Sequence, residues 1–245
     1  MSAADDPREY DLDALRRRLL PERAGERSTS IPELAGADQH LCAIALALPD
    51  GSVRSSADGT KRFSIQSAVK PFLFALALAD TDGGALDRLG IEPTGEAFDA
   101  IKLESGTGRP PNPMVNAGAI LTCALVDGDG PEERAARIVT GLSAFAGRAL
   151  QVDDDVSRSE HLLGDRNHAL AHLMRDEGTL EATADDAVAV YARACAVLVD
   201  AEILAVMGAT LAMGGVNPVS GERVVSARIA RDVVAVMATC GVYDG

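Results

Sequence analysis

The chain of 245 residues contains no tryptophan, five phenylalanines and three tyrosines, so aromatic residues make up 3% of it. So few rings exclude a platform for single-stranded nucleic acid, which stacks bases on aromatic side chains. Basic residues are also scarce, because 23 Lys and Arg stand against 37 Asp and Glu, for a net charge of −14. Binding to a polyanion needs clustered Lys and Arg, so a nucleic-acid partner is not expected.

Cysteine is sparse, and neither a C-x-x-C pair nor a metal-binding spacing occurs among Cys42, Cys123, Cys195 and Cys240. Each lies in an apolar stretch, which predicts buried thiols in a reducing compartment. Two long uncharged runs, residues 110–126 and 203–221, are interrupted by Pro, Gly and Asn, so neither is expected to span a bilayer. The N-terminus lacks the basic and apolar regions of a secretory signal. We therefore expect a cytoplasmic protein without a membrane partner.

Aliphatic residues, by contrast, are abundant. The hydrophobic content of 47% excludes a disordered chain and allows a large core, in one domain or two closely packed ones. Residues 83–118 are rich in Gly and Pro and are expected to form a long ordered loop. Apolar residues at helical spacing predict helices at 8–20, 67–80, 131–148, 153–177 with an interruption at Gly164, 184–200, 202–213 and 227–240.

Strands are predicted only near the N-terminus. In residues 41–59, large apolar residues alternate with Ala around the turn Pro49-Asp50-Gly51, which predicts a β-hairpin. Residues 60–66 continue briefly as a strand, and no further sheet is expected after them. Because a lone hairpin is marginally stable in water, we expect that strands which complete its sheet are missing from this sequence.

The sharpest local signal is Ser67-Ala-Val-Lys70, at the predicted switch from strand to helix. Residues three apart share a helix face, so the hydroxyl and the amine can meet. The positive potential of a helix N-terminus favours an alkoxide and disfavours an ammonium, and burial beside Phe72 and Phe74 would favour the neutral amine further. These are the conditions for a serine nucleophile with a lysine base. The alternative is an N-cap serine beside a solvated lysine.

Other polar residues stand where they could bind a ligand, each with a structural alternative. Asn112 and Asn116 share one Gly- and Pro-rich loop, in which an Asn either forms a turn or presents its amide to a cleft. Glu160 and Asn167 lie seven residues apart, which places them on one face of an unbroken helix. Their alternative is a solvated surface pair.

These residues belong to longer motifs that follow one order from about residue 25 to the C-terminus: FSIQSAVKPF, EPTGEAFDAIKLE, RPPNPMVNAGAI, SEHLLGDRNHALAHLM, YARAC, MGATLAMGGVNP and MATCGVYDG. Together they resemble the serine-dependent glutaminase family. The resemblance implies an α+β fold of the serine β-lactamase and penicillin-binding-protein type, with an antiparallel sheet flanked by helices and a helical domain. It also implies hydrolysis of L-glutamine to L-glutamate and ammonia without a metal or an organic cofactor.

The resemblance also implies a role for individual residues. Ser67 would be the nucleophile, Lys70 the base that takes its proton, and Tyr243 a relay of a proton towards the leaving ammonia. The residues implied to bind substrate are Ser67, Gln66, Asn116, Glu160, Asn167, Tyr191 and Tyr243, with Gln66 against the amide and Glu160 suited to the α-ammonium. One carboxylate for the cation and neutral donors for the carboxylate suit a zwitterion. The alternative role of Tyr191 is to fill the hydrophobic core.

The sequence departs from the family pattern in two places. Ser30, in STSIPELA, stands where the family usually has a substrate-contacting Tyr, and the family continues past YDG into a KSG-type motif and several strands that we expect to be missing here. An alternative function is therefore a catalytically impaired, shortened homologue that binds an amino acid or needs a partner to fold. A β-lactam or D-alanyl peptide substrate is a further alternative, against which the lack of a secretory signal counts.

The domain organisation follows from the same considerations. We expect residues 1–24 to form an N-terminal helix and residues 25–245 a glutaminase-like catalytic domain. Within that domain, 25–66 would form the sheet part, 67–225 the mainly helical part, and 226–245 a helix that returns towards the sheet. The expected partners are L-glutamine as a small-molecule substrate and further copies of the chain, in a homodimer or homotetramer.

Overall fold

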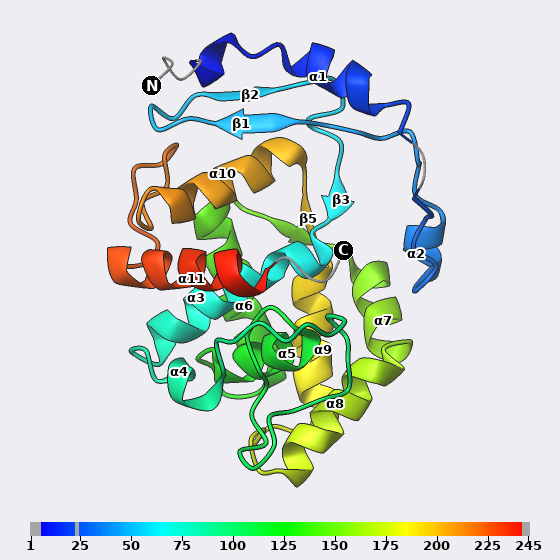
Figure 1. The fold of residues 1–245 in the computed structure, drawn as a ribbon, viewed down its shortest axis with the longest axis vertical. Coiled ribbons are helices and arrows are strands. Elements are labelled where there is room, and N and C mark those ends of the chain that lie inside the picture. Colours follow the sequence, from blue (N-terminus) through cyan, green and yellow to red (C-terminus); the bar gives the residue numbers. More distant parts are fainter. Residues whose placement is uncertain (1–5, 23–24, 242–245) are drawn as a thin grey trace.

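The computed structural model describes residues 6–22 and 25–241, which are mainly helical (Figure 1). The strands are β1 (Ala45–Ala47), β2 (Val53–Ser55), β3 (Phe63–Ser64), β4 (Gln151–Val152) and β5 (Val197–Val199). The helices, with 3₁₀ turns labelled η, are η1 (Pro7–Glu9), α1 (Leu12–Leu19), α2 (Pro32–Ala35), η2 (Gln66–Val69), α3 (Lys70–Asp80), α4 (Ala85–Arg88), α5 (Asn116–Leu125), α6 (Pro131–Ala146), α7 (Asp154–Leu162), α8 (Asp165–Asp176), α9 (Ala184–Cys195), α10 (Ala201–Ala212) and α11 (Ala227–Cys240). Within these ranges no helix combines the length and the apolar character needed to cross a membrane.

The strands form two small antiparallel sheets. β1 and β2 pair as the predicted hairpin, with Leu46 opposite Arg54. The expectation of no further sheet is wrong, because β5 lies between β3 and β4 in a three-stranded sheet, with Phe63 opposite Val199. β5 occupies the end of the helix predicted at 184–200, which stops at Cys195. A three-residue apolar run carries no readable period, so helix and strand cannot be told apart there.

The core lies among the helices below the hairpin, with α9 at its centre. α9 packs against α5, α6, α7 and α8. It begins where the hydroxyl of Thr183 accepts the backbone N–H of Asp186, as an N-cap residue does. Residues 72–78 of α3 and 116–123 of α5 are buried almost continuously, so both helices are covered on all sides. This packing, which is mainly aliphatic, fixes the elements that carry the site.

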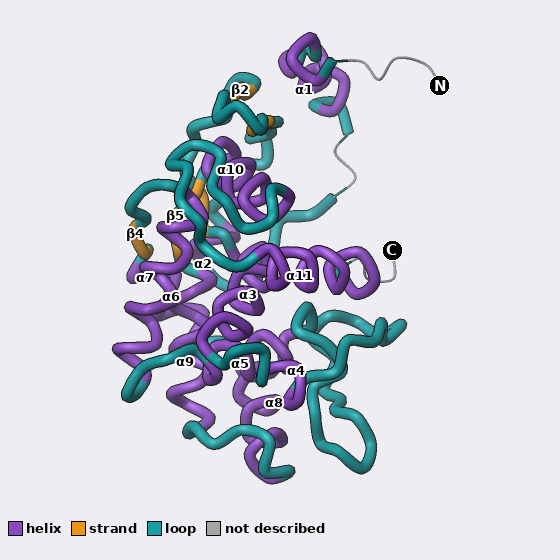
Figure 2. The backbone as a smooth tube through the Cα atoms, turned by 90° about the vertical axis from the view of Figure 1, so that its left-hand side faces the viewer, coloured by secondary structure: helices purple, strands orange, loops and turns teal. Residues whose placement is uncertain are grey.

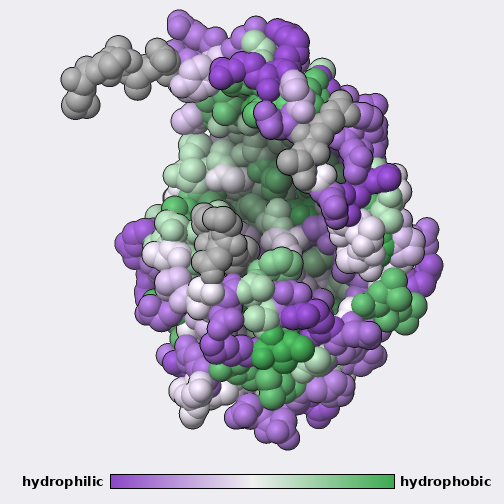
Figure 3. Space-filling view, turned by 45° about the vertical axis from the view of Figure 1, so that its right-hand side comes forward, coloured by the Kyte–Doolittle hydropathy of each residue, from purple (hydrophilic) through white to green (hydrophobic). Residues whose placement is uncertain are grey.

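The hairpin forms a separate upper layer that packs on α10, and α1 lies beyond it (Figures 1 and 2). Ser55 of β2 donates to the carboxylate of Glu202 in α10 at 2.5 Å, and Arg16 of α1 donates to the carbonyl of Cys42 at 2.6 Å. Figure 3 shows the surface hollowed between this layer and the helical body, with hydrophobic residues at the floor of the hollow. The hairpin is therefore joined to the helical body through α10, whereas Arg16 holds α1 to the hairpin layer.

The structure corrects one expectation about burial, at Cys42, and shows how little of α1 is covered. The predicted N-terminal helix forms, but of its apolar residues only Leu12 is buried, whereas Leu15 and Leu19 are 38% and 51% exposed. The helix rests on a thin hairpin layer, which offers too little surface to cover its whole apolar face. Three cysteines are buried free thiols as predicted, but Cys42 in the hairpin layer is only half-buried.

Candidate functional site

Ser67 lies at the turn from β3 into α3. The helix predicted to start there begins instead as the 3₁₀ turn η2, and α3 proper starts at Lys70. Pro71 lies in the first turn of α3, where its missing N–H costs no hydrogen bond. Gln66 has a φ of 50°, in the left-handed region that non-glycine residues seldom adopt. This local geometry leaves Ser67 exposed while Lys70 points into the protein.

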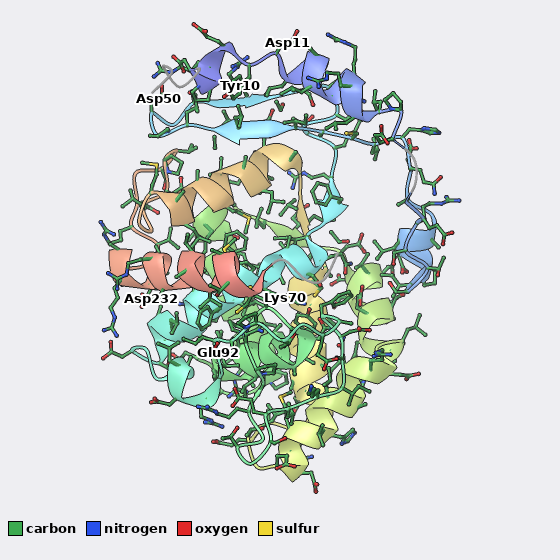
Figure 4. The ribbon with its side chains drawn as sticks, viewed as in Figure 1. Tyr10, Asp11, Asp50, Lys70, Glu92 and Asp232 are labelled. Atoms are coloured by element: carbon green, nitrogen blue, oxygen red, sulfur yellow. The ribbon has the colours of Figure 1, made fainter. Side chains whose placement is uncertain are left out.

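Lys70 is a buried lysine at the middle of the molecule (Figure 4), with 2% of its surface exposed. Its Nζ donates to Oδ1 of Asn116 at 2.8 Å and lies 5.3 Å from the centre of the Phe98 ring. Burial lowers the pKa of Lys70 from 10.5 to about 8, while the charges of Cys195 and Asp99 raise it in part. Lys70 can therefore lose its proton near neutral pH, as a general base requires.

The two asparagines of the RPPNPMVNAGAI loop take different roles. Asn112 is the turn former, since its Oδ1 accepts the backbone N–H groups of Met114 and Val115. Asn116 opens α5 and faces the site, where its Oδ1 accepts from Lys70 and its Nδ2 donates to Oδ1 of Asn167 at 3.0 Å. A hydrogen-bonded series Lys70–Asn116–Asn167 therefore connects α3, α5 and α8. Of the two roles that the sequence left open, Asn112 forms a turn and Asn116 presents its amide to the site.

Glu160 and Asn167 do not lie on one unbroken helix. Leu163 and Gly164 separate α7 from α8, so that Glu160 lies near the end of α7 and Asn167 in the first turn of α8. Burial raises the pKa of Glu160, and a hydrogen bond with Gln66 opposes that shift. A partly buried carboxylate of this kind suits a cationic ligand group, because a cation restores the charge balance that burial disturbs.

Tyr191 lies on α9 and is 3% exposed. Its hydroxyl is hydrogen-bonded with Ser67 and with Cys195, and burial raises the pKa of Tyr191 well above its usual range. Burial also raises the pKa of the Cys195 thiol to about 12, so this cysteine is no nucleophile at neutral pH. Tyr191 is thus both a core residue and a neutral hydrogen-bonding group at the predicted nucleophile.

A cavity of about 520 Å³ joins these side chains, a size typical of small-molecule sites. The residues predicted from sequence that line it are Gln66, Ser67, Asn116, Glu160, Asn167 and Tyr191. Ser30, the departure from the family pattern, lines it too. Lys70 lies behind this lining and reaches it through Asn116. Tyr243 falls outside the described residues, so its predicted place at the site stays a prediction.

The cavity also has lining residues that sequence reasoning did not select. Phe98 and Asp99 come from the long loop, and Arg166 pairs with Asp99 at 2.9 Å. Phe98 lies in the motif EPTGEAFDAIKLE, and a Phe in so aromatic-poor a chain was the available signal. Cys195 follows Tyr191 by four residues on α9, which puts both on one helix face.

The arrangement supports acyl transfer on a small zwitterion. Ser67 supplies an exposed hydroxyl, Lys70 a base of lowered pKa, and Glu160 a carboxylate in the same cavity. Among the described residues, one group of side chains is close enough together to hold a metal ion, namely His161, His168 and Asp185. None of the three lines this cavity.

The relatives reported below from the comparison with known proteins are all glutaminases. Residues 25–245 match the glutaminase family. A glutaminase of Clavibacter michiganensis subsp. michiganensis is 69% identical over 244 residues, which cover 99% of this chain and 75% of that protein. A glutaminase of Nostoc sp. is 45% identical over 215 residues, which cover 87% of this chain and 64% of that protein.

Solved structures agree with this similarity. The crystal structure of Mglu in its L-glutamate binding form, in the presence of 4.3 M NaCl, is 44% identical in sequence and matches with a TM-score of 0.90. The match covers 96% of this chain and 54% of the Mglu chain. The native form of Mglu gives the same TM-score of 0.90. The chain thus spans about half the length of Mglu and between 64% and 75% of the two relatives.

Proposed function

Because the chain belongs to the glutaminase family and has its α+β, serine β-lactamase-like fold, we propose that it hydrolyses the side-chain amide of L-glutamine to L-glutamate and ammonia. The observation that carries this proposal is that an exposed Ser67 lines the cavity while Lys70, three residues along the chain, is buried behind the lining with a lowered pKa. A solvated lysine beside an N-cap serine, the alternative, would have neither the burial nor the lowered pKa.

The proposed chemistry begins when neutral Lys70 accepts the proton of the Ser67 hydroxyl. Oγ of Ser67 then attacks the side-chain amide carbon, and the proton passes to the amide nitrogen, which leaves as ammonia. A water molecule hydrolyses the resulting γ-glutamyl ester, which restores Ser67 and releases L-glutamate. The 3₁₀ turn supports this role, because it presents the serine to the cavity one turn before the buried lysine. Tyr243 as a proton relay stays a prediction from the resemblance.

The other end of the cavity suits the amino-acid end of the substrate. We propose that Glu160 pairs with the α-ammonium and that Asn116, Asn167 and Tyr191 bind through neutral hydrogen-bonding groups. Mglu, a similar protein, has a structure in an L-glutamate binding form, which fits a product of this chemistry. A site that demands a free α-ammonium would reject glutaminyl peptides, because Glu160 would be left half-buried without a counter-charge.

The test is ammonia release from L-glutamine by the 245-residue chain and by Ser67→Ala. We expect Ser67→Ala to fall to background while it keeps the thermal stability of the wild type. Ser220→Ala, in an exposed turn far along the sequence, is the matched control and should keep full activity. Ammonia release that is undiminished in Ser67→Ala, or absent from the folded wild type, would contradict the proposal.

Two finer predictions rest on the resemblance and on the sequence. We propose a homodimer or homotetramer, which light scattering of the purified chain would test. We also propose a cytoplasmic location, which cell fractionation would test.

A further inference from the structure

Three side chains that the proposed reaction does not use converge where α7, α8 and α9 meet. His161 lies near the end of α7, His168 in the first turn of α8 and Asp185 in the first turn of α9. Nε2 of His161 is 2.9 Å from Oδ1 of Asp185, and Nε2 of His168 is 3.6 Å from the same oxygen. The two imidazole rings are 5.4 Å apart between their centres. Two imidazoles and one carboxylate therefore face one point.

The backbone orients one of these imidazoles as a ligand. Nδ1 of His168 lies 3.1 Å from the carbonyl oxygen of Gly164, which can only accept a hydrogen bond. Nδ1 therefore carries a proton, which leaves Nε2, on the side of Asp185, as the nitrogen that a metal ion would bind. This is the arrangement that fixes metal-binding histidines in proteins, with one nitrogen held by a carbonyl and the other free to coordinate.

The distances fit a transition-metal ion. Zinc binds histidine nitrogen at about 2.0–2.1 Å and carboxylate oxygen at about 2.0–2.2 Å, which for a tetrahedral ion separates the two donors by about 3.3–3.5 Å. The observed nitrogen–oxygen separations of 2.9 and 3.6 Å lie on either side of that range, and all three donor atoms lie within 4.8 Å of one another. Small side-chain rotations would bring them to coordinating distance.

We propose that His161, His168 and Asp185 bind a divalent first-row transition metal of the zinc class. Imidazole donors select such ions over Ca²⁺ and Mg²⁺, which require oxygen ligands. The side chain of Asp185 is 74% exposed, so water can reach the ion and complete its coordination. The net charge of −14 attracts cations to the surface in general but provides no imidazoles, so the two histidines decide the selectivity.

The position of this cluster gives it a consequence for the cavity. Each helix that supplies a ligand also contributes to the cavity lining: His161 directly follows Glu160, and His168 directly follows Asn167. Asp185 shares α9 with Tyr191. A bound ion would therefore tie together the three helices that hold the proposed amino-acid end, while Ser67 and Lys70 stand on η2 and α3. On the proposed function, occupancy would change KM for L-glutamine more than kcat.

The experiment is a calorimetric titration of the chelator-treated full chain with ZnCl₂. It is run in a Cys42→Ser background, because this half-buried thiol is a competing zinc ligand. We expect one bound ion, and we expect His161→Asn and His168→Asn to weaken its binding about ten-fold or more. His172→Asn is the matched control, since this histidine is exposed one turn further along α8 and lies outside the cluster. Zn²⁺ should also raise the melting temperature of the wild type and of His172→Asn, but not that of the two ligand variants.

The binding data alone decide the proposal, independently of glutaminase activity. Equal zinc affinity in the wild type, His161→Asn and His168→Asn would overturn it and leave adventitious surface binding only. An equal loss in His172→Asn would overturn it too. Should a histidine variant have a lowered melting temperature without zinc, Asp185→Asn replaces it, because this exposed residue keeps its shape and loses only the coordinating charge. Unchanged zinc binding in Asp185→Asn would refute the site.

Discussion

Burial of a protonated Lys70 lowers the free energy of unfolding of the wild type. Replacing Lys70 with methionine should remove this contribution and its dependence on pH. Methionine has nearly the length of the lysine stem and no charge, so it fits a position that is 2% exposed. The pKa of Lys70 falls from 10.5 to about 8 because of burial. At about 1.4 kcal/mol per pKa unit, a charged Lys70 destabilises the folded state by about 3 kcal/mol at pH 7.

The sign and the pH window follow from the direction of the shift. The folded pKa is lower than the unfolded one, so between about pH 8 and 10.5 the unfolded chain holds more protons at this residue. The wild type therefore becomes more stable relative to Lys70→Met as the pH rises through that window, by about 3 kcal/mol in all. Below pH 8 the difference is constant. The loss of the hydrogen bond to Asn116 adds about 1–3 kcal/mol of opposite sign, but that contribution does not vary with pH.

The assay is urea unfolding followed by circular dichroism, at a series of pH values from about 6.5 to about 10.5. The quantity compared is the free energy of unfolding of Lys70→Met minus that of the wild type, so the titration of groups that do not interact with Lys70 cancels. Lys61→Met, which removes an exposed lysine, is the matched control and should give a flat difference. A flat difference for Lys70→Met as well would refute the reasoning, because it would mean that burial does not lower the pKa of this lysine.

Further substitutions test the cavity and the packing behind it. Glu160→Gln should raise KM for L-glutamine about 10- to 100-fold with little change in kcat, measured from initial rates, since a charge-assisted hydrogen bond of about 1.5–3 kcal/mol is lost. Ser30→Tyr should lower KM about 2- to 10-fold by adding a ring to the cavity wall, and an unchanged or higher KM would contradict this. Gly118→Ala should reduce the free energy of unfolding by about 1–3 kcal/mol, because a Cβ would lie 2.0 Å from the carbonyl oxygen of Asn112. Gly208→Ala, in a helix with nothing within 4 Å, should instead stabilise by about 0.5–1 kcal/mol, and equal effects at the two glycines would count against the packing argument.

Features encoded by neighbouring residues could be predicted from the sequence. The helices predicted at 184–200 and 227–240 begin at Ala184 and Ala227, each directly after a hydroxyl residue, Thr183 or Ser226, whose side chain caps the first turn. The start of a helical turn at Ser67 also follows from the local sequence, although this turn is a 3₁₀ turn that leads into α3 at Lys70. In each case the physical cause acts within one turn of chain, so the local sequence contains it.

Features that depend on distant segments could not be predicted in this way. β5 is a strand because β3 and β4 supply its hydrogen bonds from both sides, and they lie more than 40 residues away in sequence. Asn112 and Asn116 have equal turn propensity, and only the packing of α5 against α3 decides that Asn116 meets Lys70. The lowered pKa of Lys70 likewise follows from the whole buried cluster around it rather than from its neighbours along the chain.

The interruption at Gly164 shows why spacing alone misplaces Glu160 and Asn167. On an unbroken helix, residues seven apart would be separated by about 10 Å along the axis, and both side chains would lie on the same face of that helix. The break instead lets α8 leave α7 in a new direction, so that each residue reaches the cavity from its own helix. A Cβ at residue 164 would lie 2.6 Å from the carbonyl oxygen of Glu160, so the close approach of backbone at this turn requires glycine. The carbonyl of Gly164 in turn fixes the imidazole of His168. One glycine therefore sets the geometry of the proposed amino-acid end and of the proposed metal site together.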